Sequence, residues 1–162
     1  MGKLQVAIGR SSTNVLWGGR TCKIHAVVDA KGPSLRLAIS GGNVHDSQMM
    51  HAFLNWKKPP LAIIADKAYV KGKIRQQIAD EAALCVVPAK SNARNPVQHD
   101  VNLYAMRNIV ERFFCKMEDM RRLSKRLEKY AQNFLAMLHI FASKCWINCV
   151  HSLFMTEFSE PK

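Results

Sequence analysis

The sequence predicts a single domain of mixed α/β class, for three reasons. The chain has 162 residues, which is enough for one hydrophobic core and short for two. Its hydrophobic fraction of 48% is ordinary for a globular protein. Short apolar runs, as in strands, alternate along the chain with longer segments of helical periodicity. This order is typical of a mixed sheet with flanking helices.

Each element has a local signal. A β-hairpin comes first, because the Ala-Lys-Gly-Pro turn at 30–33 separates two apolar runs. A helix then opens near Asp46 or Ser47, either of which can cap it, and the two prolines at 59–60 end it. The later elements, in order, are a buried strand over 61–65, a helix over 71–83, a strand over 83–87, a polar loop over 88–100, and helices over 102–129 and 131–153.

The charge of the chain favours a polyanionic partner. Its 24 Lys and Arg outnumber 12 Asp and Glu, which gives a net charge of +12 and a pI near 9.8. Nucleic acid is the preferred partner and an acidic membrane surface is the alternative. The most apolar segment, 134–150, is shorter than a membrane span needs and carries polar residues, so we interpret it as a core helix.

The cysteines and the start of the chain indicate a cytoplasmic protein. Residues 1–12 lack the apolar stretch of a secretory signal. Five cysteines in no regular framework are typical of a reducing compartment. Cys145, Cys149 and His151 allow a zinc interpretation, but buried structural thiols are favoured because no second ligand pair follows.

Two carboxylates are candidates for a divalent metal site. Asp66 follows the buried strand over 61–65, at the sheet edge where open α/β proteins keep their sites; the alternative is a turn or capping residue. Glu111 shares one helical stripe with Tyr104 and Arg107, with Glu118 further along; the alternative is a surface ion pair between Arg107 and Glu111.

Basic residues accompany these carboxylates and form a possible phosphate track, with a merely solvated face as the alternative. The candidate DNA-binding residues are Lys67, Lys90, Arg94, Arg112, Lys116, Arg121, Arg122 and Lys125. His45 and Asp46 follow a Gly-Gly pair and either support the site or cap a helix, and the cap is favoured.

From about Thr21 to Ile147 the chain resembles the DDE transposases of bacterial insertion sequences. The Asp-Lys-Ala-Tyr block at 66–69 and the Tyr-x2-Arg-x3-Glu signature, met by Tyr104, Arg107 and Glu111, carry the resemblance. The resemblance implies a ribonuclease-H-like mixed sheet with flanking helices. It also implies a partial catalytic domain over 21–153, followed by a tail over 154–162.

The resemblance also assigns roles in DNA transposition. Asp66 would be the second catalytic acid and Glu111 the third, and both would hold Mg²⁺ in a two-metal site that cleaves and transfers strands. Tyr104 and Arg107 would support Glu111, with Tyr69, His45 and Asp46 as further supporting residues. The partner would be double-stranded DNA at transposon ends, in the bacterial nucleoid.

The chain departs from the family pattern at the first acid. Residues 1–28 contain no Asp or Glu, although the family places its first catalytic Asp on a strand before the hairpin. We therefore expect residues 1–20 to be irregular and the first strand to be missing, unless LQVAI at 4–8 replaces it. A second departure is Glu118, where the family usually has Lys.

These departures predict an inactive isolated chain. A homodimer or the product of a second reading frame are the expected protein partners. The alternative function is a non-catalytic nucleic-acid-binding protein that retains the transposase fold.

Overall fold

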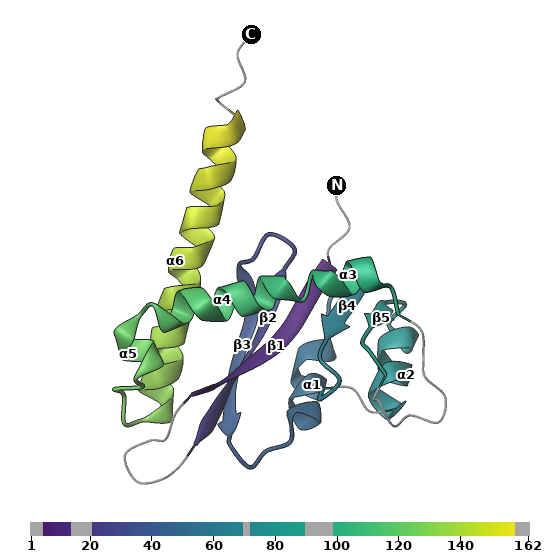
Figure 1. Cartoon of the computed structure of the whole chain (residues 1–162), viewed down its shortest axis with the longest axis horizontal. Coiled ribbons are helices and arrows are strands. Elements are labelled where there is room, and N and C mark those ends of the chain that lie inside the picture. Colours follow the sequence, from purple (N-terminus) through teal and green to yellow (C-terminus); the bar gives the residue numbers. More distant parts are fainter. Residues whose placement is uncertain (1–4, 14–20, 70–71, 90–98, 158–162) are drawn as a thin grey trace.

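The computed structural model describes residues 5–13, 21–69, 72–89 and 99–157, which form a five-stranded mixed sheet with helices on both faces (Figure 1). This confirms the mixed α/β class. The strands are β1 Gln5–Thr13, β2 Cys22–Asp29, β3 Ser34–Gly41, β4 Ala62–Ala65 and β5 Leu84–Val86. The helices are α1 Asp46–Leu54, α2 Gly72–Asp80, α3 Val101–Ala105, α4 Asn108–Glu118, α5 Arg121–Ser124 and α6 Ala131–Glu157.

Strand β1 occupies the centre of the sheet, whose order is β3-β2-β1-β4-β5. It pairs antiparallel with β2 and parallel with β4, where Ile8 lies opposite Ala65. The expectation of an irregular segment over 1–20 is therefore wrong for 5–13, and the first strand is replaced rather than missing. The reason is tertiary: two neighbouring strands need a partner, and this demand outweighs the weak strand propensity of Gly and Ser. Residues 1–4 and 14–20 lie outside the described part of the chain.

Side chains of β1 alternate between the two layers of the core. Val6 and Ile8 are buried with residues of α1 and α2, such as Met50 and Ile78. Ala7 faces the opposite layer, where residues of α4 and α6 pack on the sheet. The larger members of that layer include Ile24, Phe113, Phe114, Met117, Leu123, Phe134, Leu138 and Phe141. Because both layers include residues of β1, the strand holds the two halves of the core together.

The helix expected over 102–129 is divided. The carboxylate of Asp100 caps α3 by accepting hydrogen bonds from the amides of Asn102 and Leu103, at 2.8 and 3.1 Å. Turns at Met106 and Met120 then separate α3, α4 and α5. Neither turn contains Gly or Pro, so the sequence gives no signal for the breaks. The helix over 71–83 is likewise shorter than expected and spans Gly72–Asp80.

Helix α6 runs four residues past the expected end and beyond the sheet, so the tail predicted over 154–162 begins later (Figure 1). Nothing in residues 154–157 breaks a helix, since the next proline is at 161. Only one face of α6 belongs to the core, through Phe134, Leu138 and Phe141. Ile147 and Val150 are 67% and 58% exposed, so the core-helix interpretation holds for one face alone. No helix within the described residues is long and apolar enough to cross a membrane.

We predict that Ile8→Ala lowers the free energy of unfolding by about 2–4 kcal/mol, because Ile8 is fully buried at the centre of the sheet. Urea denaturation measures this change. Leu127→Ala is the matched control: Leu127 is 62% exposed, and its loss should cost less than about 0.5 kcal/mol. Equal stabilities of the two variants would show that β1 does not pair in the sheet.

Candidate metal centre

Asp66 lies directly after β4, at the carboxyl end of a strand that is parallel to β1. Its half-buried carboxylate accepts a hydrogen bond from the amide of Lys67 at 2.7 Å. Its carbonyl accepts one from the amide of Tyr69 at 3.0 Å, which closes a turn. Asp66 thus lies in a turn, as the alternative interpretation expected.

Glu111 lies in the first turn of α4 and forms an ion pair with Arg107. The Arg107 Nη1 to Glu111 Oε1 distance is 2.5 Å, and the two side chains are 33% and 54% exposed. The Arg107 guanidinium also lies 5.7 Å from the centre of the Tyr104 ring. At this exposure the ion pair stabilises the fold by only about 0.3–0.5 kcal/mol, so Glu111 can change partner at little cost.

The negative charges of both candidate acids affect the pKa of Tyr104. Burial raises the pKa of Tyr104, Arg107 lowers it, and the negative charges of Asp66 and Glu111 raise it further. A carboxylate acts on a phenol in this way only from close range. Asp66 and Glu111, far apart in the sequence, are therefore both within electrostatic range of Tyr104, which is compatible with a shared site. The ring of His99 packs edge-on against the other side of Tyr104, at 5.3 Å between ring centres.

A third ligand is lacking among the described residues, where no group of three His, Cys, Asp or Glu side chains could hold a metal ion. This includes Cys145, Cys149 and His151 of the zinc interpretation. Gly9 lies one position beyond Ile8, and hence beside Asp66 in the parallel register. A Cβ at Gly9 would lie 2.8 Å from Cγ1 of Val110, the neighbour of Glu111. A side chain at position 9 would therefore meet α4 at the buried side chain of Val110.

The two carboxylates alone fit one hard divalent cation. Mg²⁺ is commonly held by one or two carboxylates, with water and phosphate oxygens completing its coordination. Asp66 and Glu111 supply this donor set. They do not supply the third carboxylate expected of a two-metal site.

Three of the predicted supporting residues make contacts that stabilise the fold. The Tyr69 ring is fully buried, and its hydroxyl is 2.8 Å from Nδ1 of His25. His45, rather than Asp46 or Ser47, caps α1, because its Nδ1 accepts a hydrogen bond from the Ser47 amide at 3.2 Å. Asp46 is buried and pairs with Lys23 at 3.1 Å. Tyr69 thus anchors the turn that carries Asp66, while the roles of His45 and Asp46 at the site stay predictions.

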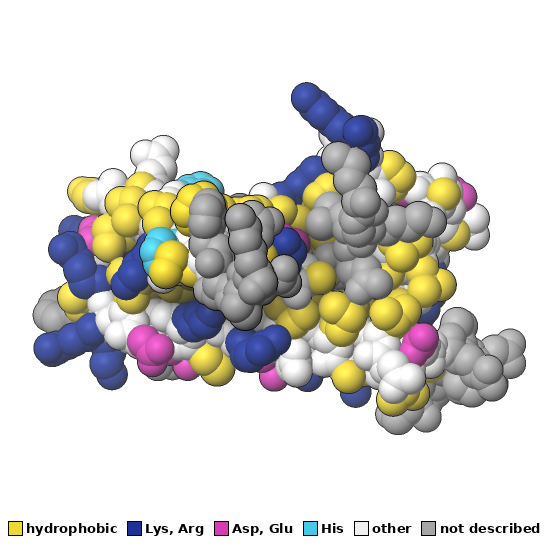
Figure 2. All heavy atoms as spheres, turned by 90° about the horizontal axis from the view of Figure 1, so that it is seen from above, with side chains coloured by type: hydrophobic (Ala, Val, Ile, Leu, Met, Phe, Trp, Pro, Cys, Tyr) yellow, Lys and Arg dark blue, Asp and Glu magenta, His cyan; other side chains and the backbone are white. Residues whose placement is uncertain are grey.

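The basic candidates are spread over several surfaces. Lys67 is exposed beside Asp66, and Arg112 and Lys116 are exposed on α4. Arg121, Arg122 and Lys125 lie in or next to α5, where Arg122 pairs with Glu128 at 2.7 Å. Lys90 and Arg94 lie outside the described residues. Seen from above, Lys and Arg side chains alternate with hydrophobic ones and acidic side chains are few (Figure 2).

The sequence did not single out Gly9, His25 or Lys31. Their neighbours come from distant segments: Gly9 meets α4, and His25 meets Tyr69. Lys31 lines a pocket with residues of α4 and α6. A short motif search has no signal for such contacts, and the turn chemistry at 30–33 indicated only a hairpin turn.

Comparison with known proteins gives a consistent result. The sequence pattern of the family "Transposase DDE domain" matches residues 12–146. The chain is 33% identical over 131 residues to the "Putative transposase for insertion sequence element IS6501" of Brucella ovis, a match that covers 78% of this chain and 98% of that protein.

Solved structures share the fold at low identity. The catalytic core domain of BIV integrase superposes with a TM-score of 0.55 at 8% identity, covering 94% of this chain and 99% of that one. A chain in the simian T-cell lymphotropic virus intasome, solved in complex with PP2A regulatory subunit B56 gamma, gives 0.52 at 13% identity and covers 82% and 45%. The ribonuclease-H-like fold expected from the sequence is thereby confirmed.

We predict that Asp66→Asn/Glu111→Gln lowers the pKa of Tyr104, because the variant removes two negative charges that disfavour the phenolate. Absorbance titration of tyrosinate measures the shift, and Tyr104→Phe identifies which transition belongs to this residue. The control Asp80→Asn/Glu118→Gln removes the same amount of negative charge at two other acids. It should leave the pKa of Tyr104 unchanged. An unchanged Tyr104 pKa in the first variant would contradict the shared site.

Proposed function

Because the chain belongs to the DDE transposase family, we propose that it is a transposase core that binds transposon-end DNA but does not cut DNA by itself. Two observations support this proposal: Asp66 and Glu111 both act electrostatically on Tyr104, and β1 has Gly9 at the position that follows Ile8, the partner of Ala65. The family supplies DNA transposition as the process. The inactivity is inferred because the described residues lack a third acid at the site.

Asp66 and Glu111 would together hold one Mg²⁺. When bound, the ion would polarise a phosphate oxygen and offset negative charge at the phosphorus. Glu111 can leave Arg107 for this purpose at a cost of about 0.5 kcal/mol, since the pair is largely exposed. Arg107 would then be available to a DNA phosphate, and the Tyr104 hydroxyl, which like any phenol is protonated at neutral pH, could donate a hydrogen bond.

The family's two-metal chemistry would need a second ion, and two Asp and one Glu would together hold both ions. Gly9 provides no oxygen ligand at the position beside Asp66. The remaining carboxylates cannot hold two ions close together, because two cations with two acids leave excess positive charge. Cleavage by this chain alone is therefore not expected.

Double-stranded DNA at transposon ends is the proposed partner. The net charge of +12 attracts a polyanion. Lys67 lies next to Asp66, and Arg112 follows Glu111, so both acids have a cation beside them in the chain. These cations would contact phosphates and position the duplex without reading its bases. Binding of this kind would place the protein with the bacterial nucleoid.

A non-catalytic nucleic-acid-binding protein is the second candidate, and the ion pair between Arg107 and Glu111 favours it. In that case Glu111 would serve only to orient Arg107 toward a phosphate. The two candidates differ in one respect, which is whether a divalent ion changes the affinity for DNA.

Two protein partners fit the surface and the sheet. Exposed apolar residues of α6, Ile140, Ile147, Val150 and Phe154, recur at helical spacing and suit packing against a second copy. The product of a second reading frame could supply the missing acid on a strand. That strand would have to displace β1 from its place between β2 and β4.

We predict that the purified chain binds a transposon-end duplex with an affinity that falls steeply with salt, and leaves both strands intact in Mg²⁺ or Mn²⁺. Fluorescence anisotropy measures the affinity and denaturing gels measure cleavage. Cleavage that disappears in Glu111→Gln would overturn the claim of inactivity. A salt-independent affinity would argue against both candidate functions.

We predict that Gly9→Asp/Val110→Ala binds Mn²⁺ at least about tenfold more tightly than the parent chain, because it adds a third carboxylate and removes the Val110 methyl groups in its way. Calorimetry measures the affinity. Gly9→Asn/Val110→Ala has nearly the same shape without the charge and is the control. If the two variants bound Mn²⁺ equally, position 9 would not belong to the metal centre.

A further inference from the structure

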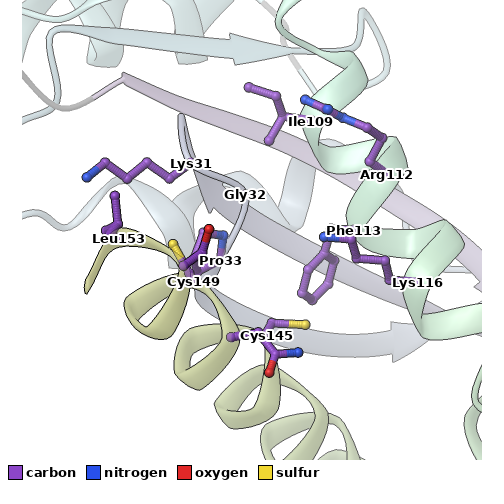
Figure 3. A pocket seen from close by; sticks show the side chains of 12 residues that line it. Lys31, Gly32, Pro33, Ile109, Arg112, Phe113, Lys116, Cys145, Cys149 and Leu153 are labelled. Atoms are coloured by element: carbon purple, nitrogen blue, oxygen red, sulfur yellow. The ribbon is translucent and has the colours of Figure 1, made fainter. Parts of the chain in front are cut away.

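A pocket lies on the side of α4 that faces α6, away from the ion pair of Glu111 (Figure 3). Its walls come from the turn between β2 and β3, from α4 and from α6. The cavity volume is about 620 Å³, within the range of pockets that hold a small molecule or one nucleotide-sized unit. These three segments are distant in sequence, so the pocket is a product of the fold.

The described side chains that line the pocket include three cations and no acid. Lys31 enters from the hairpin turn, and Arg112 and Lys116 enter from successive turns of α4. Lys116 lies close enough to the α6 wall to lower the pKa of the Cys145 thiol, against the larger raising effect of burial. The pocket therefore has a positive potential that no lining carboxylate offsets, which suits phosphate groups.

The rest of the lining is neutral and of mixed polarity. Pro33, Phe113 and Leu153 give an apolar surface, while Asn148 and Ser152 add hydrogen-bonding groups. Such a combination of cations, apolar wall and a few polar groups suits a nucleotide, which has a charged phosphate and a flat base. A free inorganic anion would leave the apolar wall unused.

Helix α4 separates this pocket from the carboxylates. Glu111 and Arg112 are consecutive, so their side chains project about 100° apart around the helix. Glu111 points with Arg107 toward the candidate metal centre, whereas Arg112 lies with Lys116, four residues on, along the pocket. A strand that crossed α4 would meet the cations on one side and the acids on the other.

We propose that this pocket binds a single strand of DNA, with phosphates on Lys31, Arg112 and Lys116 and a base or sugar against the apolar wall. The inference rests on the proposed function, because it assigns a second contact to the same DNA. A single strand is favoured over a duplex because a cavity of this size admits one unpaired nucleotide, whereas the bases of a duplex stay inside the stack.

The first test compares salt dependence in two charge-matched variants of the full chain. Each phosphate contact to a single strand contributes about 0.7 to the slope of log affinity against log salt. Lys31→Ala/Lys116→Ala should reduce the slope for a labelled 12-nucleotide single strand by about 1.4. Lys57→Ala/Lys58→Ala removes the same charge at exposed residues after α1, outside the pocket, and should leave the slope unchanged.

The second test uses cysteines that the chain already has. Cys145 and Cys149 line the pocket, whereas Cys115 is exposed four residues after Glu111, on the carboxylate side of α4. Labelling with iodoacetamide, followed by peptide mass spectrometry, measures each thiol separately. A bound single strand should slow labelling at Cys145 and Cys149.

The outcomes separate this proposal from the proposed function. Equal slopes in the two variants, or protection of Cys115 alone, would overturn the pocket and leave the DNA-binding core intact. Protection of Cys145 without Cys115 would support the pocket and count against DNA at the metal centre. Protection of Cys145 by anionic phospholipid vesicles in preference to the oligonucleotide would overturn the pocket as a DNA site.

Discussion

The pairing of β1 with both β2 and β4 is the constraint on which the rest of the structure depends. Removal of β1 would expose the edges of two strands whose residues are buried, and would take Ile8 and Ala7 from the two layers of the core. The parallel pairing of β4 with β1 also places Asp66, which directly follows Ala65, near the part of β1 that follows Ile8. Since α4 packs on β1 through Val110 and Gly9, the same strand sets the distance of Glu111 from the sheet.

Most strands and helices were predictable because their signals are local. The hairpin turn at 30–33 and the apolar run over 61–65 each specify their own structure. β1 was not predictable in this way, since Gly9 and the serines after it have low strand propensity and their pairing partners lie elsewhere in the chain. The breaks at Met106 and Met120 have the same origin: packing of α4 on the sheet sets the path of the backbone, without help from Gly or Pro.

The candidate site also has one part that the sequence could predict and another that it could not. Spacing alone places Tyr104, Arg107 and Glu111 on one helical surface, and the ion pair between the last two follows from it. Spacing cannot show that Asp66 is within electrostatic range of Tyr104, because Asp66 follows β4 whereas Tyr104 lies in α3, far along the sequence. The resemblance to the family suggested a supporting role for Tyr69. Its buried ring and the contact of its hydroxyl with His25 anchor the turn of Asp66. The pocket that Lys31 and Lys116 both line is likewise a property of the fold.

Under the proposed function, the ion pair between Arg107 and Glu111 would have to break when metal or DNA binds. Alone, each charge partly satisfies the other in an exposed contact that is worth about 0.5 kcal/mol at most. A divalent cation offers Glu111 a stronger partner, and a phosphate offers Arg107 a bidentate one. Under the proposed function, metal on Glu111 would free Arg107 for a DNA phosphate, and DNA on Arg107 would free Glu111 for metal. Each ligand would then make the other easier to bind, because both must break the same weak contact.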